Sequence, residues 1–114
     1  RGTRGMTRTF VETKEFQSRW KSLGMTEDDL RELQSYLLEH PEIAPVIQGT
    51  GGVRKLRWAR EGSGKSGSLR TIYLDMRASG LIYLITVFGK NEMENLSAEE
   101  RQAIKAYVKG LLGE

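Results

Sequence analysis

The chain has 114 residues, 38% of them hydrophobic, which is enough for one domain with a modest core. It contains no cysteine, and this excludes disulfides, thiolate metal sites and cysteine nucleophiles. No apolar run approaches the ~20 residues that a membrane-spanning helix needs. We therefore expect one soluble, cytoplasmic domain over residues 6–114, with residues 1–5 a flexible arm or a cloning remnant outside the fold.

The formal net charge of +3 is sorted along the chain. Residues 49–70 carry six basic side chains and one acidic one, a formal charge of +5, whereas residues 26–48 carry six acidic and one basic, a formal charge of −5. Such local sorting produces a positive patch that attracts a polyanion even when the whole molecule is nearly neutral. The basic segment is therefore the first candidate for a binding site.

A short strand over residues 7–12 and a helix are predicted at the start of the chain. Thr13 is a suitable N-cap for this helix, which ends at Gly24 and has an apolar stripe made of Phe16, Trp20 and Leu23. The stripe has helical spacing, so we assign Trp20 to the core.

The second predicted helix begins at Thr26 and ends before Pro41. Acidic residues in its first turn complement the helix dipole, and one face is apolar, with Leu30, Leu33 and Leu37. His40 is the sole histidine of the chain, so we assign it to the helix end rather than to metal binding or catalysis. A connecting loop is predicted over residues 42–52.

Three strands are predicted next, over residues 53–60, 69–76 and 81–88, with an antiparallel meander as the simplest pairing. The last of them is apolar at both alternating sets of positions, which predicts burial on both faces. A capping box beginning at Ser97 opens a final amphipathic helix. The order β-α-α-β-β-β-α predicts an α+β domain with helices packed on a curved antiparallel sheet.

The stretch "AREGSGKS", residues 59–66, fits a loose form of the nucleotide-phosphate loop. That loop needs a helix after it, because the helix dipole and its free N–H groups hold the phosphate. Here β-branched and aromatic residues follow, so the stretch joins strand to strand. We interpret it as a flexible basic hairpin loop rather than a nucleotide site.

The strand over residues 53–60 carries cations on both of its faces. Leu56 and Trp58 share one face with Arg54 and Arg60 at its ends, and we assign Trp58 to the core. Lys55 and Arg57 share the other face, about 6.5 to 7 Å apart. Two cations at this spacing repel each other unless an anion or an acidic partner lies over them. The alternative interpretation is a solvated basic strand edge.

Three pieces of the sequence, "QGTGGVRKLR", "LRTIYL" and "FGKNEMENLS", resemble the HigB branch of the RelE/ParE superfamily of bacterial toxins. The likeness covers nearly the whole chain from Met6 and has the same β-α-α-β-β-β-α order. It implies a RelE-like fold, an antitoxin partner of the helix-turn-helix type, and the ribosome and mRNA as targets. It also implies an mRNA endonuclease that needs neither metal nor cofactor, in which the ribose 2′-hydroxyl attacks the adjacent phosphate.

The resemblance also implies roles for individual residues. Lys55 would be the base or proton shuttle, and Arg57 and Arg70 would clamp the scissile phosphate. Contacts to the rest of the RNA would come from Arg54, Arg60, Lys65, Tyr73, Lys90 and Asn91.

The sequence departs from the RelE motif after Gly-Lys, where Asn91 replaces an arginine and no tyrosine follows at the matching position. The acid for the leaving group is therefore unassigned. Lys90, directly before Asn91, could serve as this acid, or it could simply be exposed at the end of a strand. Tyr73 and Tyr83 could stack on bases, although strand tyrosines more often pack against the core.

Two other functions are open at this point. Relatives on this fold include non-catalytic toxins that bind a protein target such as gyrase. A nucleic-acid-binding module without toxicity is the third possibility.

Overall fold

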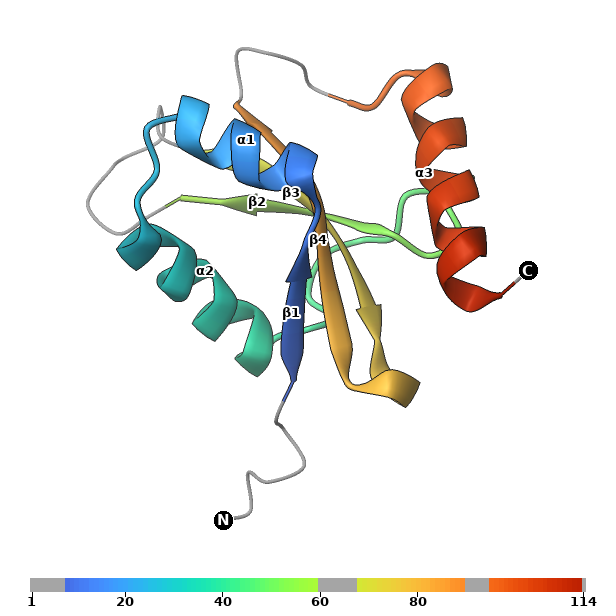
Figure 1. The fold of residues 1–114 in the computed structure, drawn as a ribbon, viewed down its shortest axis with the longest axis horizontal. Coiled ribbons are helices and arrows are strands. Elements are labelled where there is room, and N and C mark those ends of the chain that lie inside the picture. Colours follow the sequence, from blue (N-terminus) through green and yellow to red (C-terminus); the bar gives the residue numbers. More distant parts are fainter. Residues whose placement is uncertain (1–7, 60–67, 90–94, 114) are drawn as a thin grey trace.

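A computed structural model describes residues 8–59, 68–89 and 95–113 of the chain. The predicted order β-α-α-β-β-β-α is confirmed (Figure 1). A short 3-10 helix, Arg77–Ser79, makes the turn between the last two strands. The elements in chain order are β1 (Thr9–Glu12), α1 (Lys14–Ser22), α2 (Glu27–Glu39), β2 (Arg54–Trp58), β3 (Leu69–Met76), β4 (Leu81–Gly89) and α3 (Ala98–Leu112).

The four strands form one sheet in the order β1-β4-β3-β2. The antiparallel meander of β2, β3 and β4 is confirmed. The expectation of an antiparallel sheet throughout is wrong for β1, which pairs with β4 in parallel, Thr9 opposite Leu81. Turns fix the direction of consecutive strands, but β1 reaches β4 only after two helices and two strands, so no turn sets its direction.

Thr13 links β1 to α1 and to the centre of the sheet. Its hydroxyl accepts a hydrogen bond from the Phe16 N–H at 3.0 Å, which caps α1 as predicted. The same hydroxyl donates to the Ile85 carbonyl at 2.6 Å, while the Thr13 N–H donates to the Leu84 carbonyl at 3.1 Å. One residue therefore fixes the helix start against the central strand.

Helices cover both faces of the sheet: α1 and α2 lie on one side and α3 on the other (Figure 1). The α1/α2 face has a core that includes Trp20 and Trp58, whose rings lie 6.2 Å apart, as the assignment of both to the core predicted. The α3 face has its own core, a cluster that includes Ile72 and Phe88 of the sheet and Ile104 and Val108 of α3. Strand β4 contributes to both cores, which confirms its predicted burial on both faces.

The loop before β2 seats α3 against the sheet. Thr50 is fully buried; its hydroxyl donates to the Ile47 carbonyl at 2.6 Å and accepts from the Val53 N–H at 3.2 Å. Gly51 has φ +84°, and a Cβ atom there would lie 3.0 Å from the Val108 side chain of α3. Glycine is therefore required both by the backbone conformation and by the close approach of the helix.

The helix ends follow the predicted chemistry. Ser97 and Glu100 form the predicted capping box of α3, and Thr26 forms another at α2 with Asp29. His40 is the C-cap residue of α2, and its ring lies 4.9 Å from that of Tyr36. None of the helices in the described part of the chain is long and apolar enough to cross a membrane.

Candidate functional site

Three cations from neighbouring strands lie on the α3 face of the sheet. Leu56 and Trp58 belong to the α1/α2 core, so Lys55 and Arg57, which alternate with them along β2, are directed to the other face. Arg57 lies directly opposite Arg70 of β3. The structure thus brings together Lys55, Arg57 and Arg70, which we call the cation cluster.

The two arginines of the cation cluster differ in exposure. The side chain of Arg57 is exposed, whereas Arg70 is only 2% exposed, and its guanidinium donates to the Ser68 hydroxyl at 3.4 Å. Guanidinium groups do not lose their charge in proteins, so Arg70 places a permanent positive charge in a buried position on the α3 face. Like charges directly opposite each other destabilise a strand pair. Two guanidinium groups on neighbouring strands can both donate hydrogen bonds to one phosphate.

Lys55 is half-buried and reaches towards the start of α3. Its Nζ donates a hydrogen bond to Oδ1 of Asn95, at 2.8 Å. Asn95 lies directly before Leu96, which packs in the α3-face core, and before the helix cap Ser97. Asn95 could not be predicted from the sequence as part of this site, because its partner is 40 residues away and no local pattern connects the two.

Two of the expected RNA-contacting residues lie on the other side of the sheet. Arg54 donates hydrogen bonds to the carbonyls of Ala44 at 2.6 Å and Glu42 at 3.2 Å, and it lies opposite Tyr73 in the register. Arg54 therefore ties the loop after α2 to the sheet, and its expected contact with RNA does not fit this position.

Tyr73 is fully buried in the α1/α2 core, and its hydroxyl donates to the Pro41 carbonyl at 2.9 Å. Burial raises the pKa of this hydroxyl above its ordinary value of 10.0. The expectation that Tyr73 stacks on an RNA base is wrong for this conformation, because no face of the ring reaches the surface. Its alternation along β3 places it with Leu69, on the face opposite Arg70.

Tyr83 lies on the α3 face, opposite Leu74. Its ring meets that of Tyr107 edge-on, with centroids 6.4 Å apart, and burial raises the pKa of the Tyr107 hydroxyl. Leu74 is four residues along β3 from Arg70, or about 13 Å at ordinary strand rise. Tyr83 therefore packs against α3, away from the cation cluster.

Four expected contact residues, Arg60, Lys65, Lys90 and Asn91, lie outside the described residues, as does most of the basic glycine-serine loop. Within residues 8–59, 68–89 and 95–113, no group of three or more His, Asp or Glu side chains is placed to hold a metal ion.

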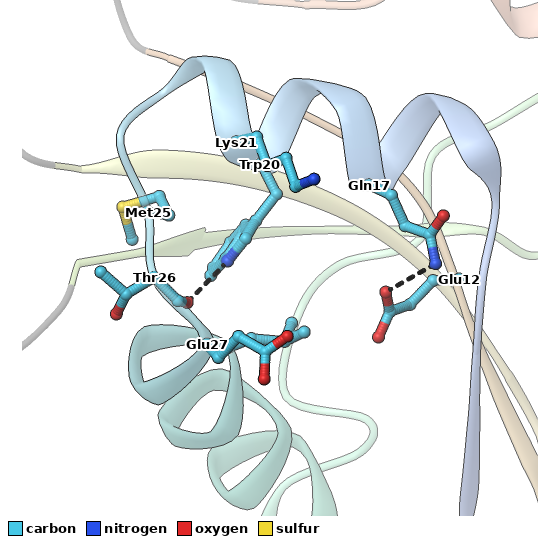
Figure 2. A pocket seen from close by; sticks show the side chains of 8 residues that line it. Glu12, Gln17, Trp20, Lys21, Met25, Thr26 and Glu27 are labelled. Carbon is cyan, nitrogen blue, oxygen red and sulfur yellow. Dashed lines mark hydrogen bonds between the residues drawn. The ribbon is translucent and has the colours of Figure 1, made fainter.

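A pocket of about 450 Å³ lies between α1 and α2, on the face opposite the cation cluster. Figure 2 shows the Trp20 indole N–H donating to the Thr26 carbonyl, at 3.0 Å, and the Gln17 amide donating to Glu12, at 3.3 Å. Met25 and Leu30 add apolar surface. The lining holds no histidine, serine or cysteine, and its polar side chains are those of Glu12, Gln17, Lys21, Thr26 and Glu27.

The chain is an α+β domain with a cation cluster on one face of its sheet, an arrangement suited to a phosphate-bearing ligand. The family of the RelE toxin of the RelE/RelB toxin–antitoxin system matches residues 46–113, which run from before β2 to the end of α3. The chain therefore belongs to the RelE toxin family. The solved structure of an arginine-to-alanine double mutant of the E. coli toxin RelE, in the free state, is similar with a TM-score of 0.60 at 20% identity, covering 90% of this chain and 97% of that one. This likeness supports the fold.

Proposed function

We propose that this protein is the toxin of a bacterial type II toxin–antitoxin module, of the HigB branch, and acts as a ribosome-dependent mRNA endonuclease. Membership of the RelE toxin family supports the first part. The observation that carries the second is the pairing of Arg57 with Arg70 beside Lys55 on one face of the sheet. An mRNA phosphate over this cluster would face the buried guanidinium of Arg70 and the exposed guanidinium of Arg57, with the Lys55 amine beside them.

In the proposed reaction, the ribose 2′-oxygen forms a bond to the adjacent phosphorus, and the bond from phosphorus to the 5′-oxygen breaks. The product carries a 2′,3′-cyclic phosphate. Lys55 takes the proton from the 2′-hydroxyl, for which its amine must be neutral. Arg57 and Arg70 stabilise the extra negative charge of the phosphorane, which is greater in the transition state than in bound RNA. The acid that protonates the 5′-oxygen is unassigned, and Lys90 is a candidate.

The proposed function implies two partners in the cytoplasm. One is the ribosome, which would present the mRNA to the cation cluster. The other is a cognate antitoxin, which we expect to be of the helix-turn-helix type. The antitoxin would neutralise the toxin by covering the cation cluster or by blocking its approach to the ribosome.

Mapping RNA ends after induction tests this proposal. Cells that express the protein should show discrete mRNA breaks within translated codons, and cells that express Arg57→Ala at the same level should not. DNA-damage signalling without RNA breaks would instead indicate a toxin that binds a protein target such as gyrase. Growth without arrest, together with RNA binding, would indicate a nucleic-acid-binding module.

A further inference from the structure

We propose that Asn95 is a positioning residue that orients the amine of Lys55 for proton transfer. This inference deepens the proposed function, because it assigns a partner to the base of that reaction. It starts from the hydrogen bond of 2.8 Å between Lys55 Nζ and Asn95 Oδ1.

Lysine is a poorly defined base without such a partner. Its amine lies at the end of a flexible four-carbon stem and samples many positions. General-base catalysis requires the amine within hydrogen-bond reach of the proton it removes. An acceptor at the right place therefore raises the fraction of time that the Lys55 amine spends near the 2′-hydroxyl.

Asn95 is itself held in place by the segment that follows it. Leu96 is 5% exposed and packs in the α3-face core, and the Ser97 hydroxyl accepts from the Glu100 N–H at 3.1 Å. The same helix is also held near its C-terminal end, where Val108 lies so close to Gly51 that a Cβ atom on Gly51 would be 3.0 Å from its side chain. The amide of Asn95 is thus attached to a fixed helix start rather than to a free loop.

The chemistry of the two groups fits a positioning role. An ammonium group has N–H donors and no acceptor, so the atom of Asn95 that faces it is the amide oxygen. When Lys55 is neutral, one N–H points to Asn95 and the lone pair is directed elsewhere, where it can accept the 2′-hydroxyl proton. The amide oxygen does not take that proton. Asn95 therefore acts through Lys55 and needs no contact with the RNA.

The test uses two substitutions of Asn95 and one matched control. Asn95→Leu keeps the size of the side chain and removes the acceptor, and we expect cleavage by the ribosome-bound toxin to slow roughly 10-fold, with little change in KM. Asn95→Asp places a carboxylate beside the ammonium and keeps it charged to higher pH. The rising part of the pH–rate profile should then move up by about one pH unit. Ser97→Ala weakens the cap of α3 and leaves the acceptor intact.

A second measurement does not depend on cleavage. NMR of the lysine side-chain ¹⁵N signals, with that of Lys55 assigned through Lys55→Arg, follows the contact in the free protein. Asn95→Leu should shift the Lys55 signal and Ser97→Ala should not. If the wild-type protein cleaves no RNA, the proposed function is wrong. If the ¹⁵N signal of Lys55 does not shift in Asn95→Leu, the hydrogen bond between Lys55 and Asn95 is rejected, whatever the result of the cleavage assay.

Two results would overturn the positioning role even in an active nuclease. One is wild-type cleavage and an unchanged pH profile in both Asn95 variants. The other is an equal loss of activity in Asn95→Leu and Ser97→Ala with no change of pH profile in Asn95→Asp, because the seating of α3 would then explain the effect.

Discussion

Two adjacent rungs of the β2–β3 ladder show how differently the two faces of the sheet are used. On one rung Trp58 lies opposite Leu69, and both belong to the α1/α2 core. On the next rung Arg57 lies opposite Arg70, on the α3 face. Side chains alternate between faces along a strand, so two strands supply both a core and a cation cluster within one residue of each other. We therefore expect substitutions on neighbouring rungs to separate effects on stability from effects on the proposed function.

Trp58→Ala should cause the largest loss of stability among substitutions on these two rungs. Trp58 is 8% exposed and its ring stacks with that of Trp20, so truncation leaves a cavity in the core. We expect the free energy of unfolding to fall by about 3–5 kcal/mol, measured by urea denaturation. Trp58→Phe is the control and should lose much less. A loss below about 1 kcal/mol for Trp58→Ala would mean that this rung does not carry the core.

Arg57→Ala should have the opposite effect to Trp58→Ala: it should reduce cleavage and leave stability nearly unchanged. The side chain is exposed, so the free energy of unfolding should change by no more than about 0.5 kcal/mol. Cleavage should fall by at least ~100-fold, because a donor to the phosphorane is lost. Primer extension on mRNA from induced cells measures this. Arg31→Ala, which removes an exposed arginine from α2, should leave cleavage unchanged, and full activity of Arg57→Ala would reject the site.

Arg70→Ala should reduce both cleavage and stability, because Arg70 is part of the cation cluster and is also buried. We expect a loss of cleavage similar to that of Arg57→Ala and a fall of about 1–3 kcal/mol in the free energy of unfolding. Cleavage is to be compared at a temperature where both variants are folded, as judged by circular dichroism. An unaltered unfolding free energy would show that the buried guanidinium contributes nothing net to stability.

The smallest effect is expected for Tyr73→Phe on the α1/α2 face. Loss of the hydrogen bond to the Pro41 carbonyl should cost about 1 kcal/mol at pH 7 and leave cleavage intact. Because burial raises the pKa of the Tyr73 hydroxyl, the unfolded chain loses this proton first as pH rises above 10. Stability should thus decline with rising pH in that range, and the decline should be shallower in Tyr73→Phe. Urea denaturation from pH 7 to 11 measures both quantities.

Much of the fold could be predicted because its signals are local. The caps at Thr13 and Ser97 and the alternation along β2 each depend on neighbours in the chain. The same alternation predicted that Lys55 and Arg57 share a face. It could not predict the parallel pairing of β1, because no turn connects β1 with β4.

The site was harder to predict than the fold, because its details depend on contacts between distant residues. Arg54 is a cation in a basic segment, yet its guanidinium donates hydrogen bonds to two backbone carbonyls of the loop after α2. The link from Lys55 to Asn95 exists only because α3 is seated beside β2. Charge counting along the sequence registers neither of these contacts.

The parallel pairing of β1 with β4 also bears on synthesis of the chain. Strand β1 leaves the ribosome before Leu81 and Leu84, so it has no partner strand until these residues follow. Asn95 and α3 leave the ribosome later still. Strand β4 pairs with both β1 and β3, so the sheet can be completed only after β4 has been made.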